Sequence, residues 1–233
     1  MKRRDDAAAD RVRTITPTAI ASELAAATPR LSEREQHLFL ALYRLLAAGQ
    51  RVDSSVLAQS ARLPVEAVRA ALERLPGLYT DDRQRVIGFW GLSIRPMPHQ
   101  MTVNGQTIYA WCAWDTLFLP ELLASMAGVQ SRCPTTGRRI TLTVEGTQVT
   151  SRDPAETVLS FLHRDRPFDA DTIRTFCHYV HFFVDPEAAA DWTAHREGTF
   201  TLSLAQGSEI AKLTNRARFP TILADWSPDE RRL

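Results

Sequence analysis

Cysteine is scarce in this chain, with three among 233 residues. An odd number of widely spaced cysteines cannot form a complete disulfide framework, and it favours a reducing compartment. Structural zinc sites usually contain a pair of cysteines or histidines two to five positions apart. The cysteines lie at positions 112, 133 and 177, so their spacing gives little support to a structural zinc site.

Long apolar runs and an excess of charge are also lacking. No apolar run approaches the ~20 residues that span a bilayer, and the net charge of +1 creates no overall field toward nucleic acid or an anionic membrane. The N-terminal Met1–Asp6 pairs arginines with aspartates rather than with an apolar segment, so no signal peptide is expected. We therefore expect a cytoplasmic protein without a membrane partner.

The first part of the chain predicts a winged helix-turn-helix at residues 31–94, after an N-terminal extension at 1–30. Ser32 and Glu35 form a capping box before an apolar helix. Two shorter helices follow, and Pro64 begins the second of them. The segments at 78–80 and 86–90 flank a polar turn and read as the two strands of a wing.

Such modules often bind DNA through their third helix. The outward positions of this helix are Glu66, Arg69, Glu73 and Arg74, whose charges cancel, whereas a DNA reader usually has a basic face. No nucleic-acid partner is therefore expected. The alternative is that residues 31–94 form a structural domain that packs against the remainder of the chain.

The second part of the chain, at 101–233, predicts a separate core. Residues 95–100 contain two prolines and no periodicity, which is typical of a boundary. The Asn104–Gly105 pair predicts a hairpin. A helix after it should bend or end near Leu119 because Pro120 follows, and a second amphipathic run is expected over Glu121–Ala127.

Further strands and helices are expected along the rest of the core. The expected strands are at 129–132, 140–144, 147–150, 158–162 and 200–204, and the expected helices are at about 169–176, 186–197 and 207–218.

The stretch Tyr109–Phe118 holds the first candidate reactive pair, Cys112 and Asp115. On a helix, residues three positions apart share one face. Cys112 also follows a predicted strand and opens a predicted helix, whose free N–H groups would lower the pKa of the thiol. The alternatives without chemistry are that Cys112 is a buried cysteine that packs as a small apolar side chain and that Asp115 caps a helix. Trp111 and Trp114 are expected in the core, where one of them could line a pocket.

The second candidate run is Phe176–Val184, which contains Cys177, His178 and His181 and alternates like a strand in its last half. On a strand the two histidines would point to opposite faces, which disfavours joint metal ligation. A Cys-His hydrolase built from Cys112 and either histidine stays open at this point.

Three local patterns stand out: A-W-C-A-x-D-T around Cys112, S-x-C-x-x-T-G around Cys133 and F-C-x-x-V-H-F-F around Cys177. Together they resemble the alkylmercury lyases, also called organomercurial lyases. The resemblance covers about residues 31–215. It implies an α+β protein in which a winged helix-turn-helix module precedes a mixed α/β core around an antiparallel sheet.

The resemblance also implies the roles of the site residues. Cys112 and Cys177 would bind mercury, Asp115 would protonate carbon and could contact the metal, and Cys133 would be structural. Some members carry a second cysteine where this chain has His178, so a helper thiol is not expected there. An organomercurial would be the substrate, and Hg(II) would stay bound as the product. Small thiols would be needed for turnover, and no other cofactor would be required. Mercuric reductase would accept the Hg(II).

Elementary chemistry agrees with this implied mechanism. Mercury(II) is a soft ion, and thiolates are the soft ligands that a protein offers. An aspartate in water, with a pKa of about 3.9, would hold no proton near neutral pH, so Asp115 needs burial or a nearby thiolate. The alternative function is a winged-helix transcriptional regulator that senses a thiophilic metal through the same cysteines.

Overall fold

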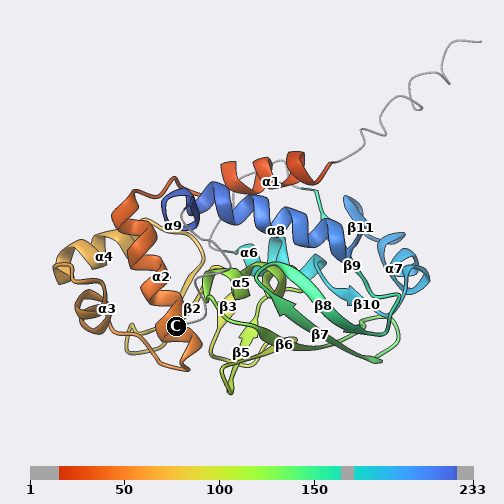
Figure 1. The fold of residues 1–233 in the computed structure, drawn as a ribbon, viewed down its shortest axis with the longest axis horizontal. Coiled ribbons are helices and arrows are strands. Elements are labelled where there is room, and N and C mark those ends of the chain that lie inside the picture. The colour runs from red at the N-terminus through yellow and green to blue at the C-terminus, as the bar shows by residue number, and fades with distance from the viewer. Residues whose placement is uncertain (1–15, 164–170, 225–233) are drawn as a thin grey trace, which may run out of the picture.

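Helices come first along the chain, strands dominate its middle, and both alternate toward its end in the computed structural model (Figure 1). The structure describes residues 16–163 and 171–224. The helices are α1 (Pro17–Ala26), α2 (Glu33–Ala47), α3 (Ser54–Ala61), α4 (Val65–Glu73), α5 (Asp115–Leu122), α6 (Thr172–Thr175), the 3-10 turn η1 (Cys177–Tyr179), α7 (Pro186–Thr193), α8 (Leu204–Arg218) and α9 (Pro220–Ala224).

The strands form two antiparallel sheets, so the α+β class is confirmed. Eight strands pair in the order β1 (Leu78–Thr80), β2 (Val86–Phe89), β3 (Leu92–Ser93), β5 (Gln106–Ala110), β4 (His99–Val103), β6 (Ala127–Arg132), β7 (Arg139–Glu145) and β8 (Gln148–Asp153). Three strands pair in the order β10 (Phe182–Phe183), β9 (Val158–Leu162) and β11 (Thr199–Ser203).

The helices of the N-terminal part begin where the sequence predicts. The Ser32 hydroxyl and the Glu35 side chain form the capping box of α2, and Pro64 is the residue before α4. The expected hairpin is also present, because β4 and β5 are joined at Asn104–Gly105, both with positive φ. These local signals succeed because each depends on neighbouring residues alone.

The helix does not end near Leu119, one of the two outcomes expected from Pro120. Helix α5 continues through Pro120 to Leu122. A proline inside a helix removes one backbone hydrogen bond, but every residue of α5 is buried, and burial of its apolar side chains outweighs that loss. The amphipathic run expected over Glu121–Ala127 is also absent, because Ala124 has a φ of +50° and turns the chain into β6.

The Phe176–Val184 run contains less strand than its alternation suggests. It begins with the turn η1, and only Phe182 and Phe183 pair as strand β10, against β9. The helix expected at about 169–176 is present only as the short α6. Positions 169 and 170 lie outside the described residues, as do positions 1–15 of the N-terminal extension.

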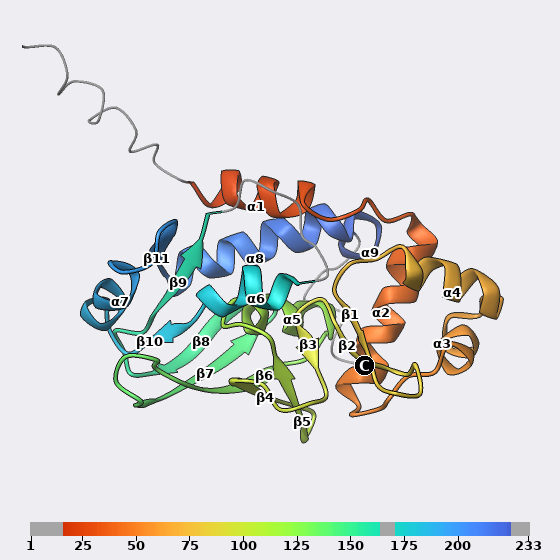
Figure 2. The same ribbon diagram turned by 180° about the vertical axis from the view of Figure 1, so that it is seen from behind.

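Helix α8 lies between α1 on one side and α5 with both sheets on the other (Figure 2). The buried Asn215 of α8 donates two hydrogen bonds to α5, at 3.0 Å to the Phe118 carbonyl and 2.8 Å to Glu121 Oε2. These bonds fix α8 over the helix that carries Asp115.

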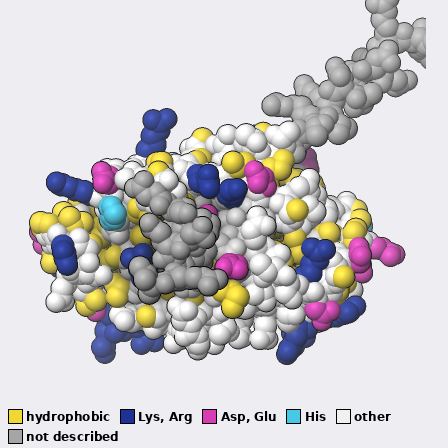
Figure 3. Space-filling model, viewed as in Figure 1, with side chains coloured by type: hydrophobic (Ala, Val, Ile, Leu, Met, Phe, Trp, Pro, Cys, Tyr) yellow, Lys and Arg dark blue, Asp and Glu magenta, His cyan; other side chains and the backbone are white. Residues whose placement is uncertain are grey.

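The surface seen in Figure 3 has basic and acidic side chains scattered among each other over its described part. In the described chain, none of the helices combines the length and apolar character that crossing a bilayer requires.

Candidate active site

Cys112 lies in the tight connection between β5 and α5, as the sequence predicts. Strand β5 ends at Ala110 and α5 begins at Asp115. The backbone N–H of Cys112 donates a hydrogen bond of 2.8 Å to Asp115 Oδ2. The carboxyl group is therefore tied to the main chain of the cysteine and not to the first turn of its own helix.

Cys177 lies in the turn η1, which precedes strand β10 of the three-stranded sheet, and its segment packs against the Cys112 loop. The N–H of Ala113 donates to the Val180 carbonyl at 3.0 Å, which joins the Cys112 loop to the segment that carries Cys177. The Ser160 hydroxyl on β9 anchors the Cys177 segment to the three-stranded sheet. It donates to the Tyr179 carbonyl at 2.8 Å and accepts from the N–H of His181 at 3.0 Å. One main-chain hydrogen bond and the Ser160 hydroxyl thus help to bring together cysteines that are distant in sequence.

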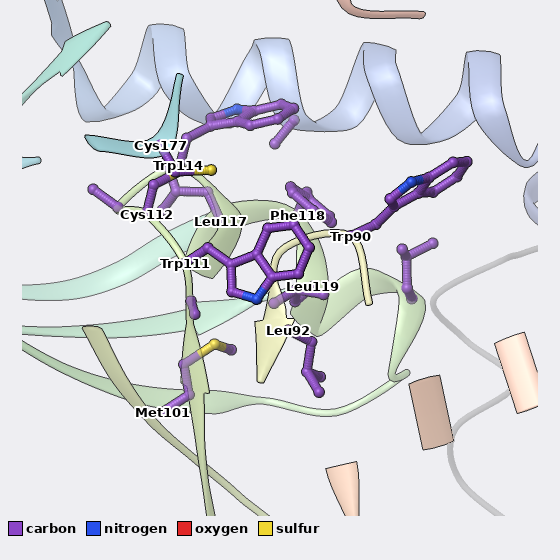
Figure 4. Close-up of a cluster of buried hydrophobic side chains, with 14 of the residues drawn as sticks. Trp90, Leu92, Met101, Trp111, Cys112, Trp114, Leu117, Phe118, Leu119 and Cys177 are labelled. Carbon is purple, nitrogen blue, oxygen red and sulfur yellow. The ribbon is translucent and has the colours of Figure 1, made fainter. Parts of the chain in front are cut away.

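One oxygen of Asp115 and the sulfurs of Cys112 and Cys177 all lie within 4.8 Å of one another. All three side chains are buried. Across residues 16–163 and 171–224, this is the one group of three or more potential metal-ligating side chains that converges in this way. In Figure 4 the two cysteines lie together with Trp114 beneath helix α8.

Burial controls the protonation of this group. Burial raises the pKa of Asp115 from 3.8 to about 6, although hydrogen bonds from Cys112 and the charge of Arg218 lower it. The pKa of Cys112 is raised by burial, and also by its hydrogen bond with Cys177 and the charge of Asp115. The expectation that a helix start lowers the pKa of Cys112 is therefore wrong, because desolvation exceeds any effect of the N–H groups.

A cavity of about 430 Å³, including the part open to solvent, is lined by Asp115 and Cys177 of this group. Its apolar walls include Trp111, Trp114 and Phe118. The indole N–H of Trp114 donates to the Gly207 carbonyl of α8 at 3.2 Å. Both tryptophans are buried, so they serve as core and as cavity wall together.

Two residues beside the site, Gly91 and Arg218, are not predicted from the sequence. Gly91, in the β2–β3 turn, has a φ of +91°, and a Cβ atom there would lie 2.7 Å from the carboxyl group of Asp115. Arg218, at the end of α8, lines the cavity. Turn glycines and arginines in a last helical turn have ordinary structural explanations, so no local signal distinguishes them.

Cys133 lies buried in a turn outside the group of three. Burial would raise the pKa of its thiol, but hydrogen bonds from Thr136, Val184 and Thr135 outweigh burial and lower that pKa.

The histidines of the second run do not belong to the group of three either. His178 is exposed, and the Nε2 atom of His181 lies 2.7 Å from the His178 carbonyl. The neighbours of Cys112 in the described cluster are therefore a thiol and a carboxyl group, an arrangement that differs from the Cys-His pair of a hydrolase.

This arrangement suits a soft metal. Two thiols can hold one thiophilic ion, and the carboxyl group beside them can accept or give a proton. Because the site is buried, charge placed there interacts more strongly than it would in water.

Comparison with known proteins agrees with this chemistry. The family model of alkylmercury lyase, MerB, matches residues 92–214. The alkylmercury lyase of Bacillus cereus is 39% identical over 182 residues, which are 78% of this chain and 82% of that protein. The enzyme of the same name from Streptomyces lividans is 39% identical over 176 residues, 75% of this chain and 80% of that protein.

A solved structure has the same fold. The crystal structure of the mercury-bound form of MerB2 superposes with a TM-score of 0.67 and 24% sequence identity, and the match covers 86% of this chain and 98% of that one. At this identity the similarity concerns the fold.

Proposed function

The chain belongs to the alkylmercury lyase family, whose members cleave the carbon–mercury bond, and from this premise we propose that Cys112, Asp115 and Cys177 carry out the reaction. The observation that supports the assignment most strongly is the convergence of two sulfurs and a carboxylate oxygen within 4.8 Å. The substrate is an organomercurial, and the apolar cavity beside the group receives its organic part.

The two thiols act first on mercury. One thiol displaces the ligand X from R–Hg–X and forms R–Hg–S, and the second adds its sulfur to the same metal. Each sulfur loses its proton as it binds, because a metal is held by the thiolate form. The added electron density makes the carbon bound to mercury basic enough to accept a proton.

Asp115 carries the proton from sulfur to carbon. With a pKa of about 6, this carboxyl group is mainly ionised at pH 7 and can accept the proton of a thiol whose sulfur is binding mercury. It then gives that proton to carbon. The carbon–mercury bond breaks, a carbon–hydrogen bond forms, and R–H leaves.

The products balance the reactants. R–Hg–X and two thiols give R–H, HX and Hg(II) held by Cys112 and Cys177. Two small thiols then release the Hg(II) and restore both cysteines, and mercuric reductase in the cytoplasm is the proposed acceptor. Mercury is substrate and product in this cycle, and we propose no other cofactor.

The most direct test supplies phenylmercury with excess 2-mercaptoethanol and measures benzene by gas chromatography. We expect benzene in proportion to enzyme and time. Tight mercury binding without benzene would contradict the catalytic assignment and would favour a mercury-sensing role.

Cysteine variants separate the proposed roles. Cys112→Ala and Cys177→Ala should each abolish benzene release, since either change leaves one sulfur for the metal. Cys133→Ala is the matched control and should keep turnover while losing about 1–3 kcal/mol in the free energy of unfolding, because it empties a buried and hydrogen-bonded position. A folded but inactive Cys133→Ala would contradict this division.

We also propose that α2, α3, α4 and the β1–β2 hairpin form a winged-helix-like domain at 31–94, before a catalytic core at 101–233. Arg69 on α4 pairs with Glu66 at 3.1 Å, and Arg74 pairs with Glu35, which supports a structural role rather than DNA binding. The alternative of a metal-sensing regulator has no support among the relatives, which are alkylmercury lyases.

A further inference from the structure

Arg218 is the basic side chain that lines the cavity beside Asp115 and Cys177. It extends from the last turn of α8, and its guanidinium lies over the ring of Trp90, 5.6 Å from the centroid. Trp90 lines the same cavity. Arg218 lies beyond residues 92–214, the part that matches the family model.

The donors of Arg218 are poorly satisfied within the part of the chain that the structure describes. A guanidinium has five N–H donors, and the hydrogen bond formed here runs from Nη2 to the Leu24 carbonyl, at 3.3 Å. The Nε atom is buried and has no hydrogen-bond partner among the described residues. None of the described carboxylates comes within 4.0 Å of the guanidinium.

Arg218 is partly buried, and a cation withdrawn from water without an anion is costly, so such groups are normally paired. Burial lowers the pKa of Arg218 to about 10, while the charges of Tyr43 and Asp115 raise it, so the side chain is still charged at neutral pH. The cavity therefore offers a positive charge beside its aromatic side chains.

We propose that Arg218 recognises a carboxylate on the organic group of the substrate, so that the enzyme prefers organomercurials with an anionic substituent over uncharged ones of similar size. This inference rests on the proposed function, because it assumes that mercury binds at Cys112 and Cys177. The carboxylate lies against the guanidinium while the aromatic side chains hold the ring between it and the metal.

The lining of the cavity suits such a ligand. A guanidinium matches a carboxylate through two parallel hydrogen bonds. Tryptophan faces bind an aryl ring well, and a ring between metal and arginine would cover apolar surface on Trp111 and Trp114.

The test compares phenylmercury with 4-carboxyphenylmercury in one buffer. Both are cleaved in the same way, with release of benzene or benzoate, and the thiol is the uncharged 2-mercaptoethanol, so the carboxylate is present on the organic group alone. The quantity measured is the ratio of kcat/KM for the carboxylated substrate to kcat/KM for phenylmercury. In Arg218→Met this ratio should fall at least about tenfold, the size of one lost charge-assisted hydrogen bond.

The control is Arg216→Met, which removes the same charge from the exposed side of α8 and should leave the ratio unchanged. Arg218→Lys keeps the charge but lacks the planar fork, so its ratio should fall several-fold; it also serves if Arg218→Met does not fold. An unchanged ratio in the folded Arg218 variants would overturn the inference while phenylmercury is still cleaved. Absence of benzene from the unmodified protein would instead contradict the proposed function.

Discussion

Asp115 differs from an ordinary aspartate in its burial, its pKa and its hydrogen bonding. It is buried, its pKa is raised to about 6, and the N–H of Cys112 fixes one of its oxygens. A carboxyl group with this pKa can both accept and return a proton near neutral pH. The three-residue spacing predicts its closeness to Cys112, but the pKa depends on α8 and on Arg218, which no local pattern indicates.

Asp115→Asn tests the proton transfer. The amide keeps the shape of the side chain and can still accept from the N–H of Cys112, but it cannot carry a proton. We expect phenylmercury to bind with one equivalent per chain and benzene release to fall by at least about 100-fold, the lower range for loss of a general acid. Normal release by this variant would assign the proton to another group.

The same variant tests the burial of the carboxyl group through stability. Asp115 binds a proton more tightly in the folded protein than in the unfolded chain, where its pKa is 3.8. Between pH 3.8 and about 6 the folded state therefore holds more protons, and raising the pH lowers the free energy of unfolding, by about 3 kcal/mol in total. Asn has no such titration.

Urea unfolding of both proteins from pH 4 to pH 7 measures this effect. The free energy of unfolding of Asp115→Asn, minus that of the unmodified protein, should rise as pH increases and level off above pH 6. Other titrating groups, such as the buried His99 whose pKa falls to about 3, cancel in the difference. A difference that stays constant with pH would mean that the carboxyl group is solvated.

At the scale of elements, the β2–β3 turn contacts Asp115 and limits where its carboxyl group can lie. Gly91 packs its backbone against Asp115 and its carbonyl accepts from the N–H of Trp111 at 2.9 Å. Because this turn comes from a distant hairpin, the sequence of α5 alone does not show what limits the position of Asp115. Similarly, Pro120 predicts a bend or an end of α5, and burial against α8 keeps the helix from ending there.

Gly91→Ala should displace the carboxyl group of Asp115, because the added Cβ would lie 2.7 Å from it. Gly105→Ala is the matched control, since its φ of +78° imposes similar backbone strain while nothing lies within 4 Å of the new atom. Both variants should lose about 1–2 kcal/mol of stability from that strain. Benzene release should fall in Gly91→Ala alone, and equal activity in the two variants would contradict the contact.

At the scale of the whole molecule, the N-terminal helices and the strands share one hydrophobic core. The Tyr43 hydroxyl of α2 donates to the Trp90 carbonyl at 2.9 Å, and Gln36 Oε1 accepts from the N–H of Thr221 on α9 at 3.0 Å. Capping residues and hairpin turns predict the order of the helices and strands. The hydrogen bonds of Tyr43 and Gln36 join segments that are distant in sequence, so no single stretch of the sequence predicts them.

We expect this shared core to unfold in one transition. Far-UV circular dichroism, which reports mainly the helices, and fluorescence of the five tryptophans, three of which line the cavity, should give the same urea midpoint. Two separate midpoints would show that the segment at 31–94 unfolds independently of the rest.

The packing of α1 against α8 also has a consequence for how the protein is made. A ribosome releases α1 well before α8, so the apolar side chains Ile20 and Leu24 of α1 are synthesised long before the helix they pack against. Domains generally fold as units during synthesis. Cys112 likewise emerges well before Cys177, and both thiols are synthesised before the second sheet and α8 are complete.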